Sequence, residues 1–183
     1  MKNRNESNRL VKECIATALI ELMKIKDYGA ITITDITTKA GVSRMAYYRN
    51  YTSKEDILNQ YIEEIGVSIH QKILKSNVYV DIETYYCALF EQLGDYRDIG
   101  LNAYRAHLGE LILKNISKNM ALTFPPKEEG GEAGYQQLYL AGAFYNVFIE
   151  WIKRGRQETP AEMARICSAL TPRDVLQRKG IKS

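Results

Sequence analysis

The sequence contains few of the residues from which disulfide and metal sites are built. Its 183 residues include only 3 cysteines and 2 histidines. Cys14, Cys87 and Cys167 are widely separated and odd in number, which argues against a disulfide framework and a zinc ribbon, so we expect each to be a small buried apolar residue. A metal site at His107 and Glu110 lacks third and fourth ligands that can be named. We therefore expect no metal and no other cofactor.

Long apolar runs and β-strand patterns are also missing. The first residues, MKNRNESNR, are polar and include neither the apolar segment nor the cleavage site of a secretory signal. The longest apolar stretch, 138–152, is interrupted by Asn146 and Glu150 and is too short to span a bilayer. Because every segment with clear periodicity is helical, the sequence predicts an all-α protein. The missing secretory signal and membrane span favour a cytoplasmic protein with no membrane contact.

Motifs of the common enzyme classes are absent as well. There is no nucleophile elbow, no glycine-rich phosphate loop after a strand, and no His or Cys spacing typical of a catalytic metal. The carboxylate pairs Glu63-Glu64 and Glu128-Glu129 lie in segments typical of solvated surface. We therefore expect that the protein is not an enzyme.

Positive charge is concentrated near the amino terminus. The formal net charge is only +3, but residues 1–54 hold 10 Lys and Arg against 5 Asp and Glu, whereas residues 55–183 hold 15 against 17. A basic first third followed by a nearly neutral remainder indicates a phosphate-facing domain attached to a domain with another role.

Segment 32–58, TITDITTKAGVSRMAYYRNYTSKEDIL, has the start and stop signals of a helix-turn-helix. Thr32 is a good N-cap, and Gly41 can end a helix at positive φ. Val42 can pack between the two helices, and Ser43 can cap the second helix. That second helix carries no acidic residue, and its side chains suit a reader of the major groove. They are Arg44, Met45, Tyr47, Tyr48, Arg49 and Asn50.

This segment resembles the DNA-binding region of the TetR (tetracycline repressor) family of bacterial transcriptional regulators. The matching positions are Thr32, Ile36, Ala40, Gly41, Val42, Ser43, Tyr48, Tyr51, Ser53, Lys54 and Leu58. Asn50 replaces a frequent His, Tyr51 the usual Phe, and Thr37 a usual Ala, and the first two changes leave the base preference open. The resemblance covers about the first third of the chain. It implies a homodimer that binds a near-palindromic operator in double-stranded DNA, most often as a repressor that a small-molecule effector releases.

Particular residues are expected to contact DNA. Arg44, at the exposed start of the second helix, is the candidate for a bidentate contact with guanine, and Met45 and Ala46 can contact a thymine methyl group. By the resemblance, Tyr48 and Lys54 match positions that hold phosphates. Arg49 and Asn50 fit either a base or a phosphate, and Tyr47 fits either DNA or the first helix. The expected contacts are Thr32, Thr34, Ser43, Arg44, Met45, Ala46, Tyr48, Arg49, Asn50 and Lys54.

Helical periodicity continues along the rest of the chain. Helices are predicted over 8–25, 32–40, 44–50, 53–73, 134–154 and 160–171, with two or three more between 81 and 120. A loop is predicted around Pro125-Pro126, and the basic tail from Arg173 is expected to fray. We expect a DNA-binding domain at 1–52, a connecting helix at 53–75, and a helical domain for ligand binding and dimerisation at 76–183.

Aromatic residues in the second domain fit either of two roles. They can line a cavity for a flat or lipophilic effector, or they can fill the core and the dimer interface. The candidate ligand-binding residues are Tyr86, Phe90, Tyr104, His107 and Tyr145.

The last two predicted helices are candidates for the dimer interface. By the resemblance, they form a four-helix bundle with a second copy, although the first of them is also compatible with the core of a monomer. The candidate interface residues are Leu138, Ala141, Gly142, Tyr145, Phe148, Ile149, Ile152, Met163 and Ile166. An alternative function is that of an adaptor or coactivator that keeps the fold and binds a partner protein without ligand-gated repression.

Overall fold

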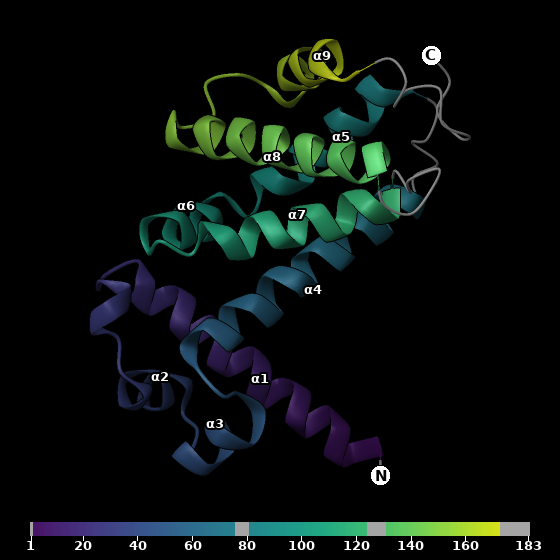
Figure 1. Cartoon of the computed structure of the whole chain (residues 1–183). Helices are drawn as coiled ribbons and strands as arrows, with labels where there is room; N and C mark the ends of the chain where they lie inside the picture. The colour runs from purple at the N-terminus through teal and green to yellow at the C-terminus, as the bar shows by residue number, and fades with distance from the viewer. Residues whose placement is uncertain (1, 76–80, 124–130, 173–183) are drawn as a thin grey trace. The chain divides into compact units, whose positions relative to one another are not determined.

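The computed structural model describes residues 2–75, 81–123 and 131–172. Within these ranges the chain forms nine α-helices and one short 3-10 helix, η1, and no strand. This confirms the predicted all-α class. Figure 1 labels the α-helices along the chain. The chain divides into two compact units, Met1–Glu63 and Glu64–Ser183, and the division falls within helix α4 (Lys54–Lys75).

The first unit contains α1 (Lys2–Met23), η1 (Tyr28–Ala30), α2 (Ile33–Ala40), α3 (Arg44–Asn50) and the start of α4. Helix α1 packs against α2 and α3. Its core is made of apolar side chains that are almost completely buried, and burial of this kind is the main stabilising term of a small domain. The core residues include Ile15, Leu19, Ile31, Ile36, Tyr47, Ile57 and Leu58.

The predicted end of the first helix is wrong. Helix α1 runs from Lys2 to Met23, so it ends two residues before the predicted position 25, and the chain then forms η1. The signals around α2 and α3 are confirmed. Gly41 adopts φ 67°, and the Ser43 side chain accepts a hydrogen bond from the backbone N–H of Ala46 at 3.1 Å.

The second unit contains the rest of α4, α5 (Ile82–Gly94), α6 (Arg97–Arg105), α7 (Gly109–Thr123), α8 (Gly131–Lys153) and α9 (Pro160–Leu170). Helix α5 packs on α9, while α8 packs on both α6 and α7. Aromatic rings of α5 and α8 meet in its core, where the centroid of Phe90 lies 5.0 Å from that of Trp151 and 5.5 Å from that of Phe144. Edge-to-face and tilted ring pairs at these distances add to the free energy gained by burial alone.

Tight turns connect the helices of this unit. His107 and Arg156 have φ values of 60° and 62°, in the left-handed region that few non-glycine residues adopt. Gly155 (φ 80°) follows the end of α8, and Thr159 begins α9 with a capping box. The predicted loop at Pro125-Pro126 and the basic tail from Arg173 lie outside the described residues.

The cysteines differ from the expectation. Cys167 is buried and Cys87 is partly buried, but Cys14 is exposed on α1. The prediction of a buried residue is therefore wrong for Cys14. Position 14 lies on the outer side of an amphipathic helix, and Ile15 and Leu19 lie on its inner side. Burial raises the pKa of the Cys167 thiol to about 11. None of the described helices combines the length and the apolar character that a membrane span requires.

Candidate nucleic-acid interface

The outer face of α3 is formed by four side chains. Met45 is 72% exposed and Tyr48 is 61% exposed, and Arg44 and Arg49 are also exposed. Tyr47 points the opposite way and is 0% exposed, because its ring packs in the core of the first unit. This settles the alternative that the sequence left open for Tyr47, which is a core residue. The exposed side of α3 therefore combines apolar groups with two guanidinium groups.

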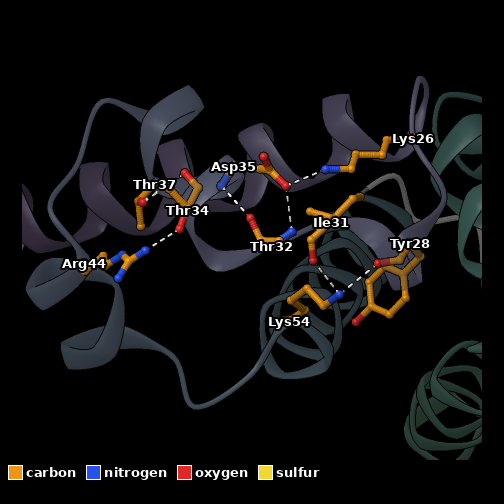
Figure 2. A network of polar contacts seen from close by, with 9 residues as sticks. All are labelled: Lys26, Tyr28, Ile31, Thr32, Thr34, Asp35, Thr37, Arg44 and Lys54. Carbon is orange, nitrogen blue, oxygen red and sulfur yellow. Dashed lines mark hydrogen bonds and ion pairs between the residues drawn. The ribbon is translucent and has the colours of Figure 1, made fainter.

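Arg44 is linked to the preceding helix. Its Nη2 donates a hydrogen bond to the Thr34 hydroxyl of α2, as Figure 2 shows. The two residues come from different helices, and the turn at Gly41 brings them together. The structure therefore joins two of the residues expected to contact DNA, at the surface where α2 and α3 meet.

Asn50 and Ala46 are less available than the sequence suggests. The Asn50 amide donates from Nδ2 to the backbone carbonyl of Ala46 at 2.8 Å, and both residues are only partly exposed. This bond uses part of the donor capacity of Asn50, while its carbonyl oxygen stays free to accept. Ser43 also has a structural role, as the N-cap of α3. Base contacts by Asn50 and Ala46 stay predictions.

The start of α2 is capped by its own side chains. The Asp35 carboxylate accepts from the backbone N–H of Thr32 at 2.8 Å, and the Thr32 hydroxyl accepts from the N–H of Asp35 at 3.1 Å. The Lys26 ammonium donates to the same carboxylate at 2.7 Å, and together these bonds hold the pKa of Asp35 well below its ordinary value. Two backbone N–H groups that a phosphate can bind are therefore already occupied.

Lys54 has two internal partners. Its Nζ donates to the backbone carbonyls of Tyr28 at 2.8 Å and Ile31 at 2.7 Å, and it lies 4.6 Å from the centroid of the Tyr28 ring. The sequence assigned Lys54 only a phosphate contact, and that contact stays a prediction. Its bonds to η1 depend on a tertiary contact that no local motif in the sequence reveals.

Positive charge on α3 is not neutralised within the first unit. Glu21 pairs with Lys39 at 2.8 Å, and the hydrogen bond from Lys39 lowers the pKa of Glu21. Asp35 pairs with Lys26. In the described part of the chain, neither Arg44 nor Arg49 forms an ion pair. The two arginines of α3 are therefore available for an anionic partner.

The five candidate ligand residues do not form one group. Tyr86 and Phe90 are buried in the aromatic core, where the Tyr86 hydroxyl hydrogen-bonds that of Thr171 at 3.0 Å. Burial raises the pKa of Tyr86 to about 12. Tyr104 and His107 are exposed, at the end of α6 and in the turn that follows it. The four residues therefore lie in two different environments.

Burial raises the pKa of Tyr145, and Tyr104 lies close enough to add to this effect. Tyr145 is partly exposed, and a Cβ atom added at Gly109 would lie 2.2 Å from its hydroxyl oxygen, so the start of α7 passes closely over this ring. A side chain at position 109 would therefore require the Tyr145 hydroxyl to move. A ligand site that includes these five residues stays a prediction.

Five of the predicted interface residues face the interior of their own unit. Ala141, Phe148, Ile149, Ile152 and Met163 are at most 5% exposed. The first four lie on the inner side of α8 and Met163 lies on α9, so contact of these residues with a second copy stays a prediction. Apolar residues on the outer side of α8 and on α9 are exposed instead. They are Tyr135, Leu138, Tyr139, Ile166 and Leu170, at 44–75%.

Two family models match the chain. "Bacterial regulatory proteins, tetR family" matches residues 15–61, and "Transcriptional regulator C-terminal region" matches residues 81–173. Each match coincides with one of the two units. The amino-terminal match contains all of α2 and α3 and therefore the face described above.

Two curated relatives are also transcriptional regulators. The chain is 20% identical over 104 residues to the HTH-type transcriptional regulator AlkX of Mycobacterium tuberculosis, covering 57% of this chain and 44% of that protein. It is 34% identical over 65 residues to the HTH-type transcriptional regulator YxbF of Bacillus subtilis, covering 34% of this chain and 17% of that protein. The chain thus spans less than half the length of each of these relatives.

Solved structures share the fold over nearly the whole chain. A TetR transcriptional regulator from Streptococcus agalactiae superposes with a TM-score of 0.67 at 16% identity, covering 93% of this chain and 98% of that one. The dihydroxyacetone kinase operon activator DhaS superposes with a TM-score of 0.56 at 17% identity, covering 90% and 96%. The FadR repressor of Thermus thermophilus, solved with lauroyl-CoA, gives a TM-score of 0.54 at 17% identity, covering 94% and 96%. With both family models matched in the order of the two units, the chain belongs to the TetR family of transcriptional regulators, which bind DNA and are not enzymes.

Proposed function

We propose that the protein is a homodimeric repressor that binds a near-palindromic operator and is released from it by a small-molecule effector. The observation that carries the DNA-binding part is the outer face of α3. This face presents Arg44, Met45, Tyr48 and Arg49 to solvent, and none of its positive charge is paired within the described residues. A helix with these side chains has the chemistry that recognition in the major groove requires. Since the operator lies in genomic DNA, the proposed location is the cytoplasm.

Each side chain of this face has a separate role in the proposal. Arg44 reads a guanine through paired N–H donors, and Met45 contacts a neighbouring thymine methyl group. Tyr48 and Arg49 hold phosphates, which fixes the position of α3 without adding sequence preference. Thr34 contacts the backbone from the adjacent helix. In this arrangement most of the affinity, and its dependence on salt, comes from the phosphate contacts.

Dimerisation is proposed through the exposed apolar face of α8 and α9. On α8, Tyr135, Leu138, Tyr139 and Gly142 lie three or four residues apart, so they form one stripe along the helix. No atom within 4 Å opposes a Cβ added at Gly142, which leaves room for another helix to approach there. A two-fold pair can place two α3 helices on successive major grooves, about 34 Å apart or somewhat more.

Effector release is proposed from the second unit. The fold resembles that of FadR, whose structure was solved with lauroyl-CoA. In the proposed mechanism, an effector stabilises a conformation of the second unit in which the two α3 helices no longer match their grooves. Such coupling is reciprocal, so operator DNA must weaken effector binding by the same factor as effector weakens operator binding.

The alternative is that the protein activates transcription or acts as an adaptor for a partner protein. Its fold also resembles that of DhaS, which is named as an operon activator. The two functions differ in what they require of α3, because a repressor that occupies its operator needs the DNA-binding face intact, while an adaptor that works through a partner does not.

The substitution of Tyr48 by Phe together with Arg49 by Ala tests this proposal. We expect affinity to fall by a similar factor on all DNA sequences, and the slope of log affinity against log salt to become shallower by about 1 for each phosphate that is no longer bound. Arg165→Ala on α9 removes an exposed charge from the other unit and serves as a control. If the double variant still regulates its target gene in cells while it no longer binds DNA, the adaptor function replaces the repressor function.

A further inference from the structure

We propose that Thr34 is a specificity-determining residue that acts by positioning Arg44. Its hydroxyl holds the Arg44 guanidinium in the orientation in which Arg44 reads its base pair. This inference rests on the proposed function, because it assumes that Arg44 reads a base. It adds a role for α2, which provides an orienting group for the reading helix in addition to phosphate contacts.

The contact joins two residues whose backbones are well anchored. Thr34 lies in the first turn of α2, where the capping box of Thr32 and Asp35 fixes the helix. Its backbone carbonyl also accepts a hydrogen bond from the hydroxyl of Thr37 at 3.2 Å, and the Thr37 side chain is buried. Arg44 is the first residue of α3, directly after its N-cap Ser43. The Thr34 hydroxyl is therefore a fixed acceptor beside a flexible cation.

The hydrogen bond leaves both side chains able to bind DNA. A guanidinium has five N–H donors, and the Thr34 hydroxyl uses only one of the two on Nη2. The second donor on Nη2 and a donor on Nη1 still form the parallel pair that guanine N7 and O6 accept. The Thr34 hydroxyl accepts from Arg44 and keeps its own proton, which it can donate to a phosphate oxygen.

Arg44 has few other constraints on its orientation. It is exposed, and in the described part of the chain it forms no ion pair and no other hydrogen bond through its side chain. A long, free arginine loses many rotamers when it binds, and a contact formed before binding reduces that entropic cost. The fixed orientation also disfavours contacts with bases that offer acceptors in another geometry.

Selection from a pool of randomised double-stranded DNA tests the proposal. The full chain is compared with Thr34→Val, which keeps the shape but removes the hydroxyl, with Thr34→Ser, which keeps the hydroxyl, and with Arg44→Ala. We expect Arg44→Ala to abolish preference at one base pair of each half-site. Thr34→Val is expected to reduce preference at that same base pair by ~2- to 10-fold, the range that one hydrogen bond can supply, and Thr34→Ser to restore it. In the Arg44→Ala background, Thr34→Val should change no base preference.

A measurement without DNA tests the positioning itself. Relaxation of the Arg44 side-chain N–H groups by NMR should show restricted motion in the wild type, greater motion in Thr34→Val, and restriction again in Thr34→Ser. Unchanged motion in Thr34→Val overturns the proposal, and so does a loss of affinity that is equal on all sequences. If the wild type shows sequence preference but Arg44→Ala leaves it unaltered, the positioning role is wrong while the proposed function stands. If the wild type selects no sequence, the proposed function itself fails.

Discussion

The ammonium of Lys54 lies 2.7 Å from the backbone carbonyl oxygen of Ile31, and this hydrogen bond joins the first residue of α4 to the residue that precedes the N-cap of α2. A second bond runs from the same ammonium to the carbonyl of Tyr28 at 2.8 Å. The Ile31 side chain is 2% exposed and packs in the core of the first unit. Ile31 is therefore held by its side chain as well as by the hydrogen bond to its carbonyl. Lys54 therefore stabilises the path by which the chain enters α2.

Replacement of Lys54 by Ala is expected to destabilise the first unit. Two charge-assisted hydrogen bonds are removed and their carbonyls are left without this partner, so the free energy of unfolding should fall by about 1–3 kcal/mol, measured by urea denaturation. Lys72→Ala, at an exposed position on the same helix, is the matched control and should change stability little. A Lys54→Ala variant with full stability but weaker DNA binding would show that Lys54 acts only on phosphate.

The pH dependence of stability should depend on Asp35. The hydrogen bond from Lys26 is the largest cause that lowers the pKa of Asp35, followed by the backbone N–H of Thr32. Because the folded-state pKa lies below the unfolded one, the stabilisation is fully present at neutral pH and is lost as pH falls below the ordinary value near 3.8. The difference in unfolding free energy between the wild type and Asp35→Asn should therefore shrink between pH 6 and pH 3.

Asp27→Asn is the control for Asp35→Asn. Asp27 lies nearby and precedes η1, but its side chain makes no capping hydrogen bond. The Asp27→Asn variant therefore removes one negative charge without removing a helix cap. A stability difference for Asp35→Asn that stays constant across this pH range would contradict the linkage between Asp35 and folding.

Among the described residues, two non-glycine residues have positive φ, and replacement of each by glycine should change stability in opposite directions. His107 is exposed, so His107→Gly relieves an unfavourable backbone conformation and should stabilise the protein by about 0.5–1 kcal/mol. Arg156 has nearly the same φ, but its guanidinium donates to the carbonyl of Gly94 at 2.9 Å and lies 5.2 Å from the Trp151 ring. Arg156→Gly removes both interactions and should destabilise the protein.

Thermal unfolding of both glycine variants distinguishes backbone strain from side-chain interactions. The expected order of melting temperature is His107→Gly, then wild type, then Arg156→Gly. If both variants gain stability, the side chain of Arg156 contributes less than its backbone conformation costs. If both lose stability, then His107 has an interaction that its exposed position does not suggest.

A charge on the outer side of α8 should dissociate the dimer. Tyr139 is 66% exposed in the isolated chain, and at the proposed interface Tyr139→Glu would bury an unpaired carboxylate. Sedimentation velocity should show a shift from dimer to monomer, while circular dichroism stays helical. Leu10→Glu, at an exposed apolar position on α1, controls for the loss of apolar surface alone. A wild type that sediments as a monomer contradicts the proposed assembly.

Local sequence signals predicted the helix-turn-helix of α2 and α3 well, because these signals act over only a few residues. The caps at Thr32 and Ser43 and the turn at Gly41 follow from side-chain and backbone chemistry within one turn of a helix. The bonds from Lys54 to η1 and from Arg44 to Thr34 were not predicted. They join positions 10–26 residues apart, and their existence depends on how the helices pack.

A different reason explains why the sequence did not distinguish the inner side of α8 from its outer side. Apolar residues surround most of this helix, so its periodicity does not indicate which side meets α6 and α7. Phe148 and Ile152 turned out to be buried, and Tyr135 and Tyr139 to be exposed. The same holds for Tyr86 and Tyr104. Both are tyrosines in helical segments, and only the fold shows that Tyr86 is buried and Tyr104 is exposed.

The central claim is that the outer face of α3 reads DNA sequence. The most direct test is selection of bound duplexes from a randomised DNA pool at two salt concentrations, with the wild type and an Arg44→Ala/Arg49→Ala variant. We predict that the wild type enriches a near-palindrome whose half-sites lie on successive major grooves, that affinity falls as salt rises, and that the variant enriches nothing. Equal recovery of all sequences by the wild type, or an unchanged motif in the variant, would contradict the claim.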